Sequence, residues 1–148
     1  MISTKGRYGM RAMLDLTIHS AEEKVSLSSI AERQNISVNY LEQVFAALRK
    51  AGLVKSIKGA QGGYVLGRPP ASITVGEILR ALEGDLRIAG DYEQGQGQTR
   101  NSYEYCIRIN VWDKLEESIR QIVDSLTLED LALEYSKLNE NLAYMFYI

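Results

Sequence analysis

The sequence predicts a mainly α-helical fold with one small β-hairpin and a long helical extension. Three observations support this fold class. A short and a longer helical pattern flank a turn near residue 35, a glycine-rich segment at 58–63 lies between two strand patterns, and apolar residues recur at heptad spacing over 112–126. We therefore expect residues 1–84 to form one domain and residues 103–148 to extend from it.

Composition limits the class of protein. The chain has 148 residues, of which 45% are hydrophobic, and this fraction argues against wholesale disorder. No apolar run approaches the roughly 20 residues needed to cross a bilayer. The polar, basic start MISTKGRYG lacks the apolar stretch of a secretion signal. The single cysteine, Cys106, excludes an intrachain disulfide and fits a reducing cytosol. We expect a cytoplasmic protein with no membrane partner.

The net charge of −2 conceals an asymmetry between the two halves of the chain. Residues 1–70 hold 10 Lys and Arg against 5 Asp and Glu, whereas residues 71–148 hold 7 against 14. A basic half suits a polyanion, because neutralised phosphates release their counterions. The acidic half is expected to turn away from DNA. A chance imbalance in a soluble protein explains the same numbers, so charge alone leaves nucleic-acid binding open.

The first helix is expected to begin at Ser3 or Thr4, whose hydroxyl can cap the free amides of the first turn. Its predicted buried face consists of Met10, Met13, Leu14, Thr17 and Ile18. Lys5, Arg7 and Arg11 crowd the first turns. The helix dipole disfavours cations there, although positive charge and free amides suit a phosphate. The basic start is therefore either a phosphate contact or a solvated helix end.

A helix-turn-helix pattern follows. A short helix is expected over 27–34, with Ser26 or Ser28 as its cap. The chain then turns at residues 35–36, and Ser37 caps a second helix that runs to about Lys50.

The second helix has an apolar stripe and an opposite polar face. The stripe consists of Leu41, Val44, Phe45 and Leu48, and the face consists of Asn39, Glu42, Gln43, Ala46, Arg49 and Lys50. Asn39 and Gln43 can address adenine, and Glu42 can accept a hydrogen bond from the amino group of cytosine. Arg49 and Lys50 would reach phosphates. A plain solvated helix face is the alternative interpretation of this face taken alone.

A β-hairpin is predicted over residues 53–66. Leu53–Ile57 and Tyr64–Leu66 have strand patterns, and a glycine-rich turn joins them. Glycines let the backbone approach another surface, so the turn residues Lys58, Gly59 and Ala60 are predicted to touch DNA. A nucleotide-binding loop is the alternative, but no Gly-Lys-Ser/Thr follows and the turn joins two strands.

These elements define a winged helix-turn-helix domain over residues 1–84, with the helix-turn-helix at about 26–50 and the wing at about 53–66. Thr74 and Glu77 form a capping-box pattern that opens a helix ending before Gly84.

The second part of the chain is predicted to mediate pairing. Residues 85–102 hold a Gln-Gly run without apolar periodicity, which predicts a mobile loop. A long helix is expected over 103–125. Its heptad seam, the predicted dimer interface, consists of Trp112, Leu115, Ile119, Ile122 and Leu126. Packing of this seam within the same chain is the alternative.

A last helix is expected from the Thr127 cap to about Leu138, followed by an apolar, aromatic terminus at 143–148. Chain ends are normally polar and loosely held. This terminus therefore either packs back on the dimer or enters the pocket of a partner.

Four motifs occur together: STKGRYG at 3–9, YLEQ at 40–43, GLV at 52–54 and GGYVL at 62–66. They resemble the Rrf-two family of bacterial winged-helix repressors, in the same order and over essentially the whole chain. The resemblance implies a homodimeric, sequence-specific DNA-binding transcriptional repressor without enzymatic activity. Together with the patterns above, it predicts as DNA-binding residues Ser3, Thr4, Lys5, Arg7, Tyr8, Ser37, Asn39, Tyr40, Glu42, Gln43, Arg49, Lys50, Lys58, Gly59 and Ala60.

Some members of this family carry an iron-sulfur cluster on three cysteines, with five residues between successive ligands. Cys106 resembles the third of these cysteines, whereas Gln94 and Arg100 stand at the other two positions. Ile109 stands where such members have a histidine ligand. One thiolate cannot hold a cluster, so we expect no cofactor and no metal. An iron-sulfur or redox-sensing regulator of the same family is the alternative.

Two segments resemble the cluster-free, CymR-like branch of the family, which represses cysteine-metabolism genes. They are DSLTLEDLA at 124–132 and AYMFYI at 143–148. The resemblance implies a complex with the cysteine synthase CysK, an enzyme that accepts the C-terminal isoleucine of serine acetyltransferase in its active site. Tyr147 and Ile148 are therefore predicted to bind this partner. A module whose main function is to present its tail to a partner enzyme is a further alternative.

Overall fold

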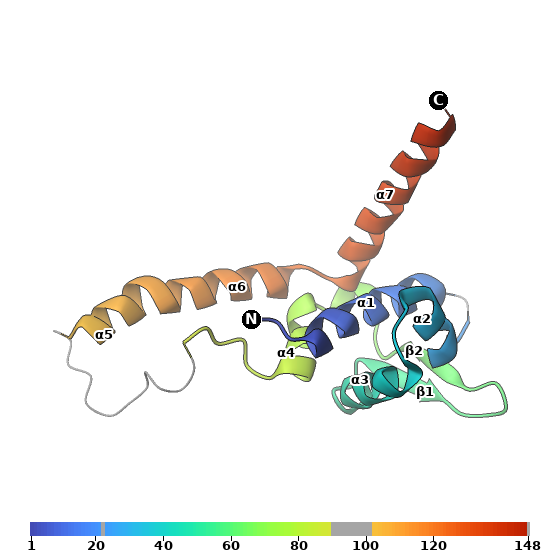
Figure 1. The fold of residues 1–148 in the computed structure, drawn as a ribbon, viewed down its shortest axis with the longest axis horizontal. Coiled ribbons are helices and arrows are strands. Elements are labelled where there is room, and N and C mark those ends of the chain that lie inside the picture. The colour runs from blue at the N-terminus through green and yellow to red at the C-terminus, as the bar shows by residue number, and fades with distance from the viewer. Residues whose placement is uncertain (22, 90–101, 148) are drawn as a thin grey trace.

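The computed structural model of the chain describes residues 1–21, 23–89 and 102–147. Helices α1 to α4 and the β-hairpin form one compact unit, and two long helices lead away from it in different directions (Figure 1). Within these residues, no helix combines the length and the apolar character needed to cross a membrane. The predicted fold class, mainly helical with a two-stranded wing, is confirmed.

The helix-turn-helix consists of α2 (Leu27–Gln34) and α3 (Val38–Lys50). Both helices begin at serine caps, in which the Ser26 and Ser37 hydroxyls accept hydrogen bonds from backbone N–H groups at 3.2 and 3.1 Å. Asn35 ends α2 in the left-handed conformation, with φ of 54°. Asparagine tolerates this conformation well, so the tight turn between the two helices is encoded locally.

The wing pairs β1 (Val54–Ile57) with β2 (Gly63–Leu66) in antiparallel register, from Val54 opposite Leu66 to Ile57 opposite Gly63. Val25 adds a bridge to Tyr64 through two backbone hydrogen bonds of 2.9 and 2.7 Å. A Cβ atom on Gly63 would lie 2.8 Å from the carbonyl oxygen of Val25, so glycine permits this close approach. The hairpin is thereby tied to the segment before α2.

The buried face of α1 (Thr4–His19) differs from the predicted one. Of the predicted residues only Met13 is fully buried, while Met10, Leu14, Thr17 and Ile18 are half-buried. The fully buried positions are instead Gly6, Gly9, Ala12, Met13, Asp15 and Leu16. The apolar pattern could not identify this face, because two glycines provide its closest approach to α4. A Cβ atom on Gly9 would collide with the side chain of Leu82.

The core of the unit lies between α1, α3 and the following helix α4 (Val75–Glu83), and a 3-10 turn at Pro70–Ser72 precedes α4. The stripe predicted for α3 is fully buried: Leu41, Val44, Phe45 and Leu48. Phe45 also meets Tyr64 of the wing edge to face, with ring centroids 4.9 Å apart. One apolar cluster therefore joins α3 to the wing.

The long helix predicted over 103–125 is confirmed, but it contains a π-helical segment that was not predicted. It comprises α5 (Tyr103–Ile107), the π-helical turn (Arg108–Trp112) and α6 (Asp113–Ser125). The last helix, α7 (Leu128–Tyr147), runs well past its predicted end near residue 138. Most of the loop predicted over 85–102 lies outside the described residues.

The bases of α6 and α7 are fixed to the compact unit. Leu128 is fully buried in the core, and its N–H donates to the carbonyl of Ile73 at 3.0 Å. Leu126 accepts from the N–H of Val75 at 2.8 Å. Arg80 of α4 donates two hydrogen bonds, of 2.6 and 3.0 Å, to the carboxylate of Asp124 at the end of α6. The end of α6 and the start of α7 are thus held beside the start of α4.

Candidate nucleic-acid interface

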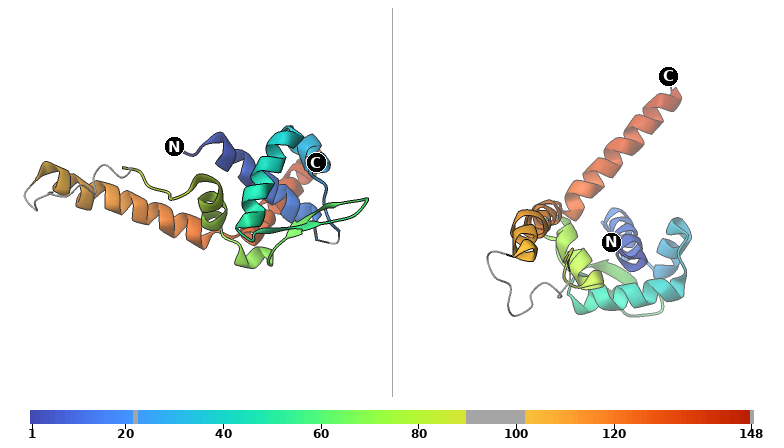
Figure 2. Two further views of the ribbon diagram at one scale, coloured as in Figure 1. Left: turned by 90° about the horizontal axis from the view of Figure 1, so that it is seen from below. Right: turned by 60° about the vertical axis from the view of Figure 1, so that its left-hand side comes forward.

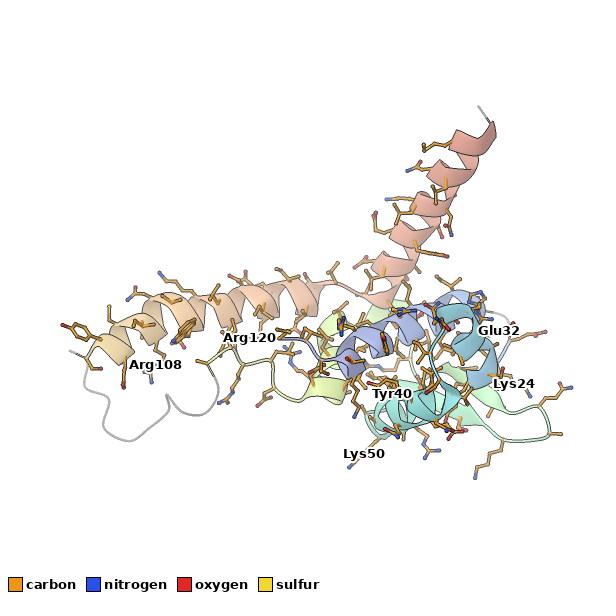
Figure 3. The ribbon with its side chains drawn as sticks, in the orientation of Figure 1. Lys24, Glu32, Tyr40, Lys50, Arg108 and Arg120 are labelled. Carbon is orange, nitrogen blue, oxygen red and sulfur yellow. The ribbon has the colours of Figure 1, made fainter. Side chains whose placement is uncertain are left out.

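The polar face predicted for α3 is exposed along its whole length. Asn39, Glu42, Gln43, Ala46, Arg49 and Lys50 all lie on the solvent side, opposite the buried stripe. Tyr40 lies near the start of α3 and Lys50 at its end (Figure 3). Such a face offers hydrogen-bonding side chains near the N-terminus and cations near the C-terminus, which is the arrangement of a helix that reads a major groove.

An aromatic contact joins the start of α3 to α1. The rings of Tyr8 and Tyr40 meet edge to face, with centroids 5.9 Å apart and planes at 85°. The guanidinium of Arg11 lies 5.3 Å from the centroid of the Tyr8 ring, within the range of a cation–π interaction. This contact brings the basic first turns of α1 beside the N-terminus of α3. Arg11 was noted in the sequence for its charge, but its packing role was not predicted.

The first turn of α1 is held by an acidic residue of α4. Glu83 accepts hydrogen bonds from the N–H of Ser3 at 2.9 Å, the N–H of Gly6 at 3.0 Å and the Ser3 hydroxyl. These hydrogen bonds hold the pKa of Glu83 below its usual value, and the bond from the Ser3 hydroxyl has the largest effect. The backbone amides at the start of α1, which the sequence suggested as a phosphate site, therefore donate to Glu83 within the chain. Lys5 and the exposed Arg7 lie beside them.

A buried carboxylate clamps α1 to α2. The Asp15 side chain is fully buried and accepts two hydrogen bonds from Arg33, at 2.9 and 2.7 Å, and one from Gln34 at 2.9 Å. Burial alone would raise the pKa of Asp15, but the hydrogen bonds from Arg33 and Gln34 and the charge of Arg33 outweigh it and lower the pKa. Arg11 donates to the backbone carbonyl of Gln34. The clamp thus fixes the residue that precedes the turn at Asn35.

This clamp was not predicted. Its only local signal is a charged residue between two leucines in an apolar stretch, and the partners lie 18 and 19 positions further along the chain.

The wing tip extends beyond the compact unit, as the left view of Figure 2 shows. Lys58, Gly59 and Ala60 are exposed. Gly59 has a φ of 133°, a backbone conformation that residues with a side chain rarely adopt. The predicted DNA-binding residues are thus distributed over three elements: α1 and α3, joined by the tyrosine pair, and a separate wing tip. The contacts of these residues with DNA stay a prediction.

The heptad seam faces outward. Leu115, Ile122 and Leu126 are 45%, 59% and 37% exposed, and Ile119 is half-buried. The residue of α6 that α4 buries is Val123, which lies outside the seam. The indole N–H of Trp112 is buried without an acceptor among the described residues. Three of the five seam residues, Leu115, Ile122 and Leu126, are therefore left exposed in the part of this chain that the structure describes.

The potential metal ligands of this chain do not match those that hold the iron-sulfur cluster in other members of the family that it resembles. Cys106 is exposed on α5, and it is the single cysteine of the sequence. Ile109, one helical turn after Cys106, has no atom that can bind iron. The other two ligand positions are Gln94 and Arg100, which lie outside the described residues. The described residues contain no group of three or more potential metal ligands. A cluster needs about four protein ligands, which these residues cannot supply.

The predicted partner-binding residues are only partly described. Tyr147 ends α7, and Ile148 lies outside the described residues. The helix that leads to them projects from the compact unit (Figure 1) and exposes Leu133, Tyr135, Leu138, Leu142 and Met145.

The fold and this surface define a winged-helix regulator of transcription. Residues 2–134 match the family model of Rrf2, described as an iron-dependent transcriptional regulator. The chain belongs to the Rrf2 family, whose related proteins are named as transcriptional regulators and not as enzymes.

Individual relatives support this assignment. The chain is 46% identical to the HTH-type transcriptional regulator CymR of Bacillus subtilis, over 99% of both chains. The solved structure of B. subtilis CymR, the global cysteine regulator, is similar with a TM-score of 0.76 and 42% identity, covering 90% of this chain and 97% of that one. The IscR structure of T. potens has a TM-score of 0.74 and 47% identity, covering 91% and 88% of the two chains.

The Asp15 clamp has a predictable pH signature. We expect Asp15→Asn to lower the free energy of unfolding by about 2 kcal/mol at neutral pH, as hydrogen bonds to a charged group contribute roughly that much. The folded pKa of Asp15 is depressed, so its contribution is complete above the unfolded value of about 3.9 and is lost as the pH falls through the folded value. The difference between wild type and variant should therefore shrink below about pH 4.

Urea unfolding at several pH values measures this difference. Glu134→Gln is the matched control, because Glu134 forms an exposed pair with Lys137 at 3.3 Å and should contribute little at any pH. A difference for Asp15→Asn that stays constant from pH 7 to pH 3 would contradict the clamp.

Proposed function

We propose that this chain is a homodimeric, sequence-specific repressor whose α3 lies in the major groove of its operator. The observation that carries the proposal is the exposed polar face of α3 beside the basic start of α1, joined through Tyr8 and Tyr40. Glu42 and Gln43 face the bases, Lys5 and Arg7 approach the phosphates, and the wing tip reaches the neighbouring minor groove or its backbone.

The dimer forms along α6. The exposed apolar residues of the heptad seam support a second copy as the missing partner. Two copies related by a two-fold axis would present two reading heads, which suits a pseudo-palindromic operator with half-sites about one helical turn apart.

The regulated genes are those of cysteine and sulfur metabolism, and the regulator acts in the cytoplasm. This part of the proposal rests on the similarity to a protein that is named as the global cysteine regulator of B. subtilis. The alignment extends over nearly the whole of both chains, so it covers the DNA-binding domain as well as the extension.

Two alanine variants test the proposed division between base reading and phosphate contact. Glu42→Ala should relax preference at one base position, losing about 1–3 kcal/mol of discrimination, because its carboxylate accepts from a single base edge. Arg7→Ala, as the comparison, should weaken binding to all sequences alike and make the salt slope shallower by about one.

Affinities are measured by gel shift on DNA from upstream of cysteine and sulfur-uptake genes and on unrelated DNA, at several salt concentrations. An equal loss of specific and non-specific binding in the Glu42 variant would argue against its reading role.

We also propose that the end of α7 binds the cysteine synthase CysK and so modulates repression. The observation that favours this second activity is the exposed apolar line of α7, which continues to Met145, 73% exposed, near the C-terminus. A C-terminal isoleucine would offer a carboxylate to an anion site and a branched apolar side chain behind it.

Deleting residues 147–148 should weaken the complex with CysK by about 30-fold or more, as the loss of an anchoring hot spot does, while affinity for bare DNA stays unchanged. Calorimetric titration of CysK with the dimer measures the first quantity, and the gel shift measures the second. Lys137→Ala, on the exposed side of α7, is the matched control. Undiminished binding of the truncated chain to CysK would exclude insertion of the tail.

A further inference from the structure

We propose that Glu83 is a positioning residue that couples the dimer helix α6 to the phosphate contacts of α1. We name Glu83 and its partners Ser3 and Gly6 the Glu83 clasp. The inference rests on the proposed function, because it assigns the basic start of α1 to DNA phosphates, and it adds a route by which the extension could change DNA affinity.

The first half of the route is the clasp itself. One carboxylate oxygen of Glu83 accepts from both the Ser3 N–H and the Gly6 N–H, 80 and 77 positions earlier in the chain. These are amides that the first turn of a helix cannot pair internally, so the carboxylate completes the start of α1. A Cβ atom on Gly6 would lie 2.3 Å from the same oxygen, so glycine permits the carboxylate to approach this closely.

The clasp lies within the predicted phosphate-binding segment. Lys5 and Arg7 belong to the same helical turn as Ser3 and Gly6, so the position of this turn determines where their charges lie. A shift of the Glu83 carboxylate therefore moves or frays the turn that carries both cations. The clasp thus governs the sequence-independent part of DNA binding and leaves the base contacts of α3 alone.

The second half of the route connects Glu83 to α6. Gly84 follows directly and turns the chain with a φ of 81°. Four residues later, the N–H of Ile88 donates to the carboxylate of Glu116 on α6 at 3.1 Å. The segment 84–88 is thus held at one end by the clasp and at the other by the dimer helix.

A cavity gives this segment room to move. Its volume is about 390 Å³, and its lining includes Ile2, Leu79, Glu83, Ile88, Ile119 and Val123. The cavity is therefore bounded by the N-terminal segment, α4, the connecting segment and α6. Since protein interiors are close-packed, a displacement of 84–88 relative to α6 meets fewer collisions here than it would in a packed core.

Two substitutions of Glu83 separate the hydrogen bonds from the charge. Glu83→Gln keeps an acceptor for Ser3 and Gly6, whereas Glu83→Ala removes it. We expect the alanine variant to bind all DNA sequences about 3- to 10-fold more weakly, as loss of a helix cap would allow, with a salt slope shallower by about one to two. The glutamine variant should keep the wild-type slope and bind at least as tightly. Wild-type affinity and slope in the alanine variant would overturn the proposal.

A double-mutant cycle tests the coupling. Glu116→Ala releases Ile88 and should weaken DNA binding about threefold or more in the wild-type background, but have no effect in the Glu83→Ala background. Glu117→Ala is the matched control, since its carboxylate pairs with Arg120 on the same helix, and its effect should be the same in both backgrounds. Additive effects of Glu83→Ala and Glu116→Ala would overturn the coupling.

Amide hydrogen exchange in the absence of DNA tests the coupling between α6 and the Glu83 clasp independently. The Gly6 amide should exchange faster in Glu116→Ala than in wild type, and an unchanged rate would overturn the proposal. A wild-type chain that fails to select its operator would refute the proposed function, while the Gly6 exchange rate would still decide whether the clasp responds to α6.

Discussion

The buried carboxylate of Asp15 is the interaction on which the geometry of the reading head depends. It sits on α1 and holds Arg33 and Gln34 at the end of α2, immediately before the left-handed turn at Asn35. The direction in which α3 leaves that turn therefore depends on α1. A single buried charge can have this influence because its partners satisfy it fully, and an unsatisfied buried carboxylate would be costly.

Helix α1 accordingly connects three parts of the molecule. Its middle is clamped to α2 by Asp15, its second turn touches α3 through Tyr8, and its first turn is capped by Glu83 of α4. The acidic half of the chain contributes this last contact, and the same half supplies the two projecting helices. The division of charge along the sequence thus corresponds to a basic head and an acidic extension that meet at the clasp.

The parts of the fold that were predicted correctly are those encoded within a few residues. Ser26 and Ser37 cap their helices because a hydroxyl needs only the amides two or three positions ahead. The stripe of α3 was correct because strongly apolar residues recur at the helical period. The hairpin was correct to within one residue at each strand, since glycines mark its turn.

The incorrect or missing parts depend on contacts between distant residues. The buried face of α1 was misplaced because glycines, which carry no apolar signal, make its closest contacts. Asp15 and Glu83 have partners 18 to 80 positions away, so no local pattern could identify them. The last helix was predicted to end near Leu138, yet α7 continues to Tyr147 and is exposed over residues 139–141.

In the proposed mode of binding, two winged-helix heads read DNA as a symmetric pair. Selection of binding sites from a random pool of double-stranded DNA tests it without any assumption about target genes. We expect an enriched inverted repeat, with half-sites about one helical turn, or about 10 base pairs, apart. A pool that stays unenriched, or one that yields a single unrepeated half-site, would contradict the claim.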